Sequence, residues 1–269
     1  MLQKINLSVS LIIQIILFCT VGSCTNIKDS VESKLEETKT LFKNGEYNKC
    51  IELCNVVLKV NKANYQAHHN KGDCLFMSGQ HEEALAEYDM VTKLKPDYAK
   101  AYGAKGYTLS QLKRYEEALT AYDMVIKLKP DYAEAYGTKG DILSEIKRYE
   151  EALTAYDMVI KLKPDYAKAY RAKGDIFSEI KRYKEALIMY DTALKYNPQY
   201  KEATYNKAVT LMHIGKHKEA GELYMGLWDD KTVAEYKKAL ERGEHLDFNG
   251  QHVVIIRVCP IDCVNSHKL

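Results

Sequence analysis

The apolar positions of this chain follow a helical period, and the whole pattern recurs every thirty-four residues. Within residues 99–112, and again within 115–128, apolar side chains are spaced three and four apart, which is typical of amphipathic helices. Lys113 and Arg114 separate the two stretches, and Pro130 ends the second. The segment KRYEEALTAYDMVIKLKPDY then begins again, unchanged, at Lys147. The pattern therefore predicts paired helices joined by short turns.

A fixed period of this length indicates a stack of similar units. One unit of thirty-four residues is too short to fold alone, so each helix pair must be stabilised by its neighbours. The sequence thus predicts an all-α fold, an α-solenoid of six helix-turn-helix repeats. Written as rows, the repeats are residues 31–64, 65–98, 99–132, 133–166, 167–200 and 201–232.

The chain beyond the sixth row is predicted to change character. Residues 233–243 have the pattern of a single capping helix, which would cover the apolar end of the stack. Residues 244–269 form a β-prone tail, in which Asn249 and Gly250 suggest a tight turn. We favour a tail that packs on the last helices; the alternative is an edge strand that adds to the sheet of a partner.

Certain positions of the row keep one kind of side chain. Small residues at positions 8 and 20 let the paired helices approach, and a large residue at position 24 fills the space between them. This pattern resembles the tetratricopeptide repeat, TPR, and the resemblance implies a scaffold for protein partners. The residues are Thr38, Gly72, Gly106, Gly140, Gly174 and Ala208 at position 8; Cys50, Ala84, Ala118, Ala152, Ala186 and Ala220 at position 20; and Cys54, Tyr88, Tyr122, Tyr156, Tyr190 and Tyr224 at position 24.

The first row departs from this pattern, with cysteines at two of its core positions and Lys62 in place of proline. It is therefore predicted to be a divergent end repeat. After removal of an export signal and assignment of Cys24 to a lipid, five cysteines remain, which is not the composition of a disulfide scaffold. Cys50 and Cys54 point in parallel from one helix, a poor geometry for a bridge, so we expect them to pack as small apolar residues.

Position 7 holds lysine in five rows. We expect these side chains to lay their stems on the neighbouring helix and to place the ammonium group in water. The alternative is a basic ladder for an anionic ligand. The residues are Lys71, Lys105, Lys139, Lys173 and Lys207.

The N-terminus has the layout of an export signal. Lys4 precedes an apolar stretch at residues 9–18, and polar residues follow from Asn26. The apolar stretch is short for a membrane span of about 20 residues. Residues 21–24, Val-Gly-Ser-Cys, resemble the lipobox of bacterial lipoproteins, and this resemblance implies that the last of them is lipidated.

We therefore predict a signal peptide at residues 1–23, a linker at 24–30 and lipid attachment at Cys24. A different cleaved export signal and an uncleaved anchor are the alternatives. The predicted location is the bacterial cell envelope, with lipid anchoring, or outside the cell.

Charge and motifs exclude several classes of function. The formal net charge is +2, from 39 basic and 37 acidic residues, so no nucleic-acid partner is expected. The sequence lacks a phosphate-binding glycine loop, a nucleotide fingerprint and a nucleophile elbow, which predicts a protein that is not an enzyme and needs no cofactor. His213 and His217 lie on either side of a turn at Gly215, and Cys259 and Cys263 lack a second ligand pair. No metal site is predicted, and a metal-binding or enzymatic tail is the remote alternative.

The third and fourth rows are nearly identical and differ at only six positions, all on the first helix. The resemblance to TPR proteins implies that row positions 2, 5, 9, 12 and 13 of this helix face the ligand in a concave groove. Three of the six differences fall there. We predict that the groove holds a peptide of mixed charge and that its contacts are Tyr107, Asp141, Glu145, Arg171, Asp175 and Glu179.

Chaperone-binding TPR domains use a carboxylate clamp that requires asparagine at position 9. Here position 9 holds Asp73, Asp141 and Asp175 in three rows, and no row has asparagine. We therefore predict no clamp for an acidic chaperone terminus. The predicted function is a non-enzymatic adaptor, anchored to a membrane or exported, that binds a protein or peptide partner; a secreted effector that binds host proteins is the alternative.

Overall fold

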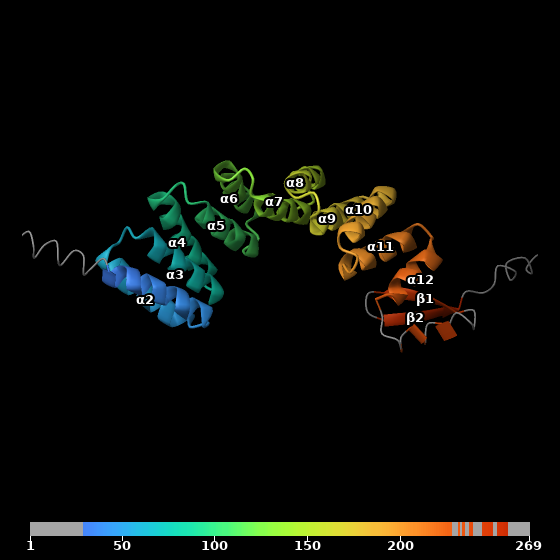
Figure 1. The fold of residues 1–269 in the computed structure, drawn as a ribbon, viewed down its shortest axis with the longest axis horizontal. Helices are drawn as coiled ribbons and strands as arrows, with labels where there is room; N and C mark the ends of the chain where they lie inside the picture. The colour runs from blue at the N-terminus through green and yellow to red at the C-terminus, as the bar shows by residue number, and fades with distance from the viewer. Residues whose placement is uncertain are drawn as a thin grey trace, which may run out of the picture. The chain divides into compact units, whose positions relative to one another are not determined.

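The computed structural model describes residues 29–227, the helical positions 231, 233–234 and 237–238, and residues 244–249 and 252–257. The chain divides after Leu162 into two compact units. Its described repeats are paired α-helices, as the sequence predicts (Figure 1). The predicted signal peptide, Cys24, and residues 258–269 with Cys259 and Cys263 lie outside the described residues.

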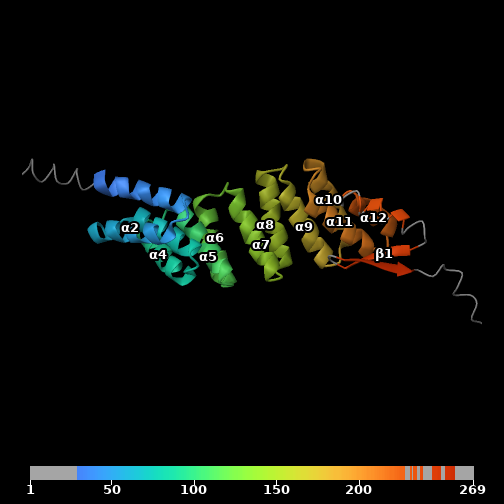
Figure 2. The same ribbon diagram turned by 90° about the horizontal axis from the view of Figure 1, so that it is seen from below.

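The first unit begins with a helix over residues 29–43 and continues as helix pairs laid one after another (Figure 2). Its further helices are α2 (Tyr47–Val60), α3 (Tyr65–Met77), α4 (His81–Leu94), α5 (Ala99–Gln111), α6 (Tyr115–Leu128), α7 (Ala133–Glu145) and α8 (Tyr149–Leu162). The second unit contains α9 (Ala167–Glu179), α10 (Tyr183–Tyr196), α11 (Lys201–His213) and α12 (His217–Met225).

The core of each central repeat is a tyrosine ring pressed against a glycine. A Cβ atom added at Gly140 would lie 2.9 Å from Cζ of Tyr156, and one added at Gly174 would lie 2.6 Å from Cε1 of Tyr190. Both distances are below van der Waals contact, so the two helices approach this closely only because position 8 lacks a side chain. The predicted small-against-large packing of positions 8 and 24 is confirmed.

Every repeat turns at position 15 through a left-handed backbone conformation. Glycine adopts it in the first, second and sixth rows, with φ of 76° at Gly45, 81° at Gly79 and 79° at Gly215. Lysine adopts it in the three rows between them. Since a side chain makes this conformation unfavourable by about 1–2 kcal/mol, the lysine turns are strained. The lysines are Lys113 (φ 58°), Lys147 (φ 61°) and Lys181 (φ 62°).

The lysines of position 7 join consecutive repeats. Within the first unit, Nζ of Lys105 lies 2.6 Å from Oδ1 of Asp89, and Nζ of Lys139 lies 2.6 Å from Oδ1 of Asp123. In both pairs the aspartate belongs to the second helix of the preceding row. These ion pairs lie at the surface, so the ammonium groups are not buried, but each is paired with a carboxylate of the neighbouring repeat, which was not predicted. The second unit repeats the arrangement with Lys207 and Asp191.

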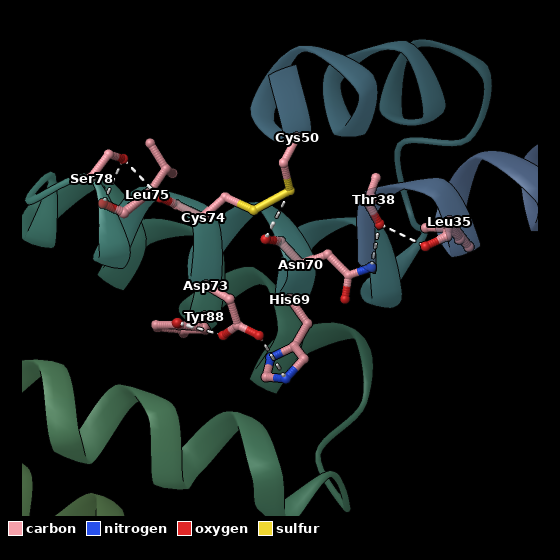
Figure 3. Close-up of a disulfide and its surroundings, with 10 residues drawn as sticks. All are labelled: Leu35, Thr38, Cys50, His69, Asn70, Asp73, Cys74, Leu75, Ser78 and Tyr88. Carbon is pink, nitrogen blue, oxygen red and sulfur yellow. Dashed lines mark hydrogen bonds and ion pairs between the residues drawn. A yellow bond between two sulfur atoms is a disulfide. The ribbon is translucent and has the colours of Figure 1, made fainter. Parts of the chain in front are cut away.

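The first two rows are joined by a disulfide bond between Cys50 of α2 and Cys74 of α3 (Figure 3). The prediction that Cys50 packs as a free small residue is thus wrong. Cys54 is the free, buried thiol of this cluster. Cys54, on the same helix, points in parallel with Cys50, whereas Cys74 on the facing helix of the next row lies opposite it.

The described part of the tail is an antiparallel hairpin of β1 (Glu244–Asn249) and β2 (His252–Arg257), with Asn249 paired to His252. Residues 250–251, which connect the strands, are outside the described part, as is most of the predicted capping helix at 233–243, of which 233–234 and 237–238 are helical. Among the described residues, no helix is both long enough and apolar enough to cross a bilayer.

Candidate functional site

The six predicted contact residues fall on three first helices. Tyr107 lies on α5, and Asp141 and Glu145 lie one turn apart on α7, all in the first unit. The other three lie on α9 in the second unit, so each unit presents its own part of the predicted face. They are Arg171, Asp175 and Glu179.

Position 9 is tied to the core of the repeat by a hydrogen bond. The hydroxyl of Tyr156 donates to Asp141 at 2.6 Å, and the hydroxyl of Tyr190 donates to Asp175 at 2.9 Å. Tyr88 and Asp73 form the same bond at 2.8 Å. The aspartates therefore accept a bond from the buried tyrosine; Asp141 is exposed, whereas Asp73 and Asp175 are half-buried. Sequence reasoning missed this role, although aspartate at position 9 and tyrosine at position 24 occur together in these three rows.

Asp175 has further partners besides the core tyrosine. Besides Tyr190, it accepts a hydrogen bond at 2.6 Å from Nδ2 of Asn206 on α11, and it forms a short ion pair with Arg171. Burial raises the pKa of Asp175, while Arg171 and the two hydrogen bonds act in the opposite direction. The negative charge of Asp175 is therefore compensated by groups of the chain itself.

Arg171 contacts Tyr200 as well as Asp175. Its Nε donates to the hydroxyl of Tyr200 at 2.9 Å, and its guanidinium lies 6.0 Å from the centre of that ring. Glu179, one turn beyond Asp175 on α9, is exposed. In the second unit, Arg171 and Asp175 thus form part of the scaffold, and their contact with a partner stays a prediction.

The third row differs from its neighbours, because Tyr107 stands where they have aspartate. The core tyrosine of this row, Tyr122, has no aspartate at position 9 of its own first helix, and its hydroxyl interacts with the side chain of Thr138 in the next row. Burial raises the pKa of Tyr122 to about 12. The Tyr107 side chain is free to turn outward, and it is 48% exposed, with its ring centre 5.4 Å from that of Phe76 on α3.

The second row places a histidine on the same face. The ring of His69 lies 5.3 Å from that of Tyr98 and 5.8 Å from that of Tyr88, and its Nε2 is 3.7 Å from a carboxylate oxygen of Asp73 (Figure 3). Burial lowers the pKa of His69. This cluster was not predicted; its only sequence signal is a histidine at position 5, where the third and fourth rows have glycine.

The histidines considered as metal ligands do not converge. His213 stacks on Tyr183 with ring centres 5.5 Å apart, whereas Nδ1 of His217 is 3.4 Å from the sulfur of Met212. Across the part of the chain that the structure describes, no cluster of three or more histidine, cysteine, aspartate or glutamate side chains could hold a metal ion.

Solved structures similar to this chain are repeat proteins of low sequence identity. YrrB, described as a TPR protein with an unusual peptide-binding site, is 18% identical with a TM-score of 0.59 over 67% of this chain and 97% of its own. PilF of Pseudomonas aeruginosa is 14% identical with a TM-score of 0.62 over 79% and 99%. MamA of Desulfovibrio magneticus is 23% identical with a TM-score of 0.56 over 65% and 96%. These likenesses concern the fold.

No curated protein matches the chain in sequence. Models of one family match most of the repeats: tetratricopeptide repeat over residues 99–132, TPR repeat over residues 140–180, and tetratricopeptide repeat over residues 41–106 and 180–243. The matched residues include the glycine, alanine and tyrosine positions that close each helix pair. Together with the helix pairs themselves, they show that the chain belongs to the tetratricopeptide repeat family.

Proposed function

We propose that this protein is a scaffold that holds a protein or peptide partner on the face formed by row positions 2, 5, 9, 12 and 13, here called the first-helix face. TPR proteins are in general non-catalytic scaffolds. The observation that carries the proposal is the contrast between the two helices of a repeat. The second helices of the third and fourth rows are identical and are fixed by tyrosine packing and ion pairs, whereas their first helices differ. First helices also expose Tyr107, Glu145 and Glu179.

The charges of this face favour a partner of mixed polarity. Asp141 and Glu145 are exposed acids of α7 and can take a basic or amide-rich segment, while Lys168 at position 2 of α9 is an exposed cation. The similarity to YrrB supports peptide binding as the mode, since that protein is described as having a peptide-binding site.

The proposal is tested by charge reversal at exposed positions only. A Glu145→Lys, Glu179→Lys double variant is compared with Glu150→Lys, which lies on the second helix α8 and is lysine in the next row. Affinity capture from the cells that produce the protein, followed by mass spectrometry, should show partners lost by the double variant and kept by the control. Identical partner sets and affinities for all three proteins would rule out the first-helix face.

We also propose that the protein works outside the cytosol, held by a lipid on Cys24. The buried Cys50–Cys74 disulfide supports export, because such bonds persist in oxidising compartments and are rare in the cytosol. The export-like N-terminus supports it independently.

Mass spectrometry of the mature N-terminus tests the anchor. The expected result is a chain that begins at a lipid-modified Cys24, and an unmodified Met1 or a cut elsewhere contradicts it. Alkylation of thiols before and after reduction tests the compartment, since only exported protein should protect Cys50 and Cys74 from the first alkylation. A chain whose two thiols react without reduction is inconsistent with export to an oxidising compartment.

A further inference from the structure

Tyr107 replaces a residue that the scaffold uses. In the second, fourth and fifth rows, an aspartate at position 9 accepts a hydrogen bond from the core tyrosine. The third row lacks that carboxylate and its bond, which is worth about 1 kcal/mol, and the Tyr122 hydroxyl interacts with the Thr138 side chain of the fourth row. The rows on either side of the fourth have alanine at the position of Thr138. Two residues in different rows thus differ together, and the result is an aromatic side chain turned toward solvent.

Tyr107 is part of an exposed apolar surface. Its ring packs at a tilt against that of Phe76, and Met77, the next residue of α3, is 49% exposed. We call Phe76, Met77 and Tyr107 the aromatic patch, since they occupy positions 12 and 13 of the second row and position 9 of the third, all on the first-helix face. An apolar surface of this kind on the predicted binding face is suited to a bulky side chain of a partner.

The side of the aromatic patch toward the fourth row is acidic. Asp141 occupies on α7 the same row position that Tyr107 occupies on α5, so the two lie at equivalent places of consecutive repeats in the first unit, and Glu145 is the next exposed acid along α7. Neighbouring packed helices lie about 8–10 Å apart, and this is the separation expected between equivalent positions of consecutive first helices. An extended peptide covers that distance in about three residues.

We infer that the partner of the first unit is a peptide segment with a bulky apolar residue, which packs on Tyr107, and a lysine or arginine about three residues away, which pairs with Asp141 and Glu145. Charge complementarity selects this occupant over an acidic or purely apolar one. The inference rests on the proposed function and gives the chemistry of the segment that the first-helix face recognises.

The test uses four synthetic peptides of about twelve residues in a Gly/Ser background. One carries Phe and Lys three positions apart, and the others replace Phe by Ala, Lys by Glu, or both. Binding to the full-length protein is followed by chemical-shift changes and fluorescence anisotropy. The Phe/Lys peptide should bind at least about tenfold more tightly than the Ala peptide and more tightly than the Glu peptide, and the preference over the Glu peptide should weaken with added salt.

Variants taken from sister rows keep the fold intact. Tyr107→Asp restores the residue of the fourth row and should weaken the Phe/Lys peptide about tenfold without loss of thermal stability. Glu145→Gln introduces the residue of the third row and should weaken it a few-fold. Met90→Thr, an exposed position of α4 that is threonine in the fifth row, is the control and should leave binding unchanged.

A selection from a random peptide library on the same protein distinguishes failure of the peptide chemistry from failure of the proposed scaffold function. If selected peptides bind and lose affinity with Glu145→Lys but lack the apolar-basic pair, or if the four designed peptides bind equally or not at all, the inference is overturned while the proposed function stands. If no selected peptide depends on the first-helix face, both fail. If Tyr107→Asp instead dissociates a complex of the chain with itself, the occupant is a second copy and the inference is again overturned.

Discussion

The first two repeats are held together by different contacts from those that hold together the repeats after them. In the third and fourth rows, Gly106 and Gly140 admit the tyrosine rings, and Lys139 and Asp123 link one row to the next. The first row has neither the glycine nor the tyrosine. It is linked to the second by the Cys50–Cys74 disulfide (Figure 3).

A hydrogen bond accompanies the disulfide. Buried Thr38 occupies the glycine position of the first row, where its hydroxyl donates to the backbone oxygen of Leu35 at 2.7 Å and accepts from Nδ2 of Asn70 at 2.8 Å. Cys54 occupies the tyrosine position and supplies much less volume. The comparison shows that a terminal repeat can diverge from the packing rule of the family when a covalent bond and a buried hydrogen bond replace the lost contacts.

The largest effect should come from the packing residue of a central row. Tyr156→Ala removes a buried ring and its bond to Asp141, so the free energy of unfolding should fall by about 3–5 kcal/mol. Cys54→Ala, at the same position of the first row, should lower it by about 1 kcal/mol. Urea unfolding followed by circular dichroism measures both. Equal losses would mean that the first row uses the same packing as the others.

Reduction should affect only the N-terminal junction. The disulfide spans 24 residues, so breaking it, or replacing both cysteines by alanine, should lower the stability of this junction by about 3 kcal/mol. Hydrogen exchange measured by mass spectrometry should show faster exchange in α2 and α3, with α7 and α8 unchanged. Uniform acceleration of exchange through the first unit would contradict a local role. If Cys50 and Cys74 both react as free thiols in the unreduced, denatured protein, the disulfide does not exist.

Substitutions at the position-15 turns should change the free energy of unfolding by smaller amounts and in opposite directions. Lys147→Gly relieves the left-handed backbone strain and should raise the free energy of unfolding by about 1 kcal/mol, whereas Gly79→Lys should lower it by a similar amount. The midpoint of urea unfolding reports each change. A Lys147→Gly protein that is less stable than the parent would show that the lysine side chain contributes more than its backbone strain removes.

The smallest effect concerns pH and distinguishes the second row from the third and fourth, which have no histidine at position 5. Because burial lowers the pKa of His69, the unfolded chain binds the proton first as the pH falls through about 6.5, and stability should decrease there. His69→Gln should reduce the loss in urea midpoint between pH 7.5 and 5.5, while His213→Gln should retain it. An unchanged pH dependence in His69→Gln would exclude this histidine as the cause.

The repeat pattern was sufficient to predict the helix pairs and the small-against-large packing, because both depend on contacts that recur at fixed spacing within a row. The disulfide was not predicted, since Cys50 and Cys74 occupy unlike positions of two different rows. A comparison of position 20 with position 10 of the next row would have found it, but such a pairing follows from the stacking of rows rather than from the period.

The candidate site was predicted as a face and not as a network. Helical spacing placed Asp141 and Glu145 one turn apart on an exposed surface, and this holds. The period did not reveal that Asp175 bonds to Arg171, Tyr190 and Asn206. These partners lie one turn earlier on the same helix, on the paired helix and in the next row. Residues that look equivalent in the rows therefore differ in how much hydrogen-bonding capacity they retain for a ligand.

The ion pairs that join one row to the next have a consequence for how the protein can evolve. Since Asp123 and Lys139 recur as Asp89 and Lys105, a duplicated block of thirty-four residues brings both halves of its own joints and fits between existing rows without a new interface. Gene duplication can thus lengthen the molecule by one repeat at a time. Each added repeat supplies another first helix, whose side chains can change while the ion pairs to the neighbouring repeats are kept.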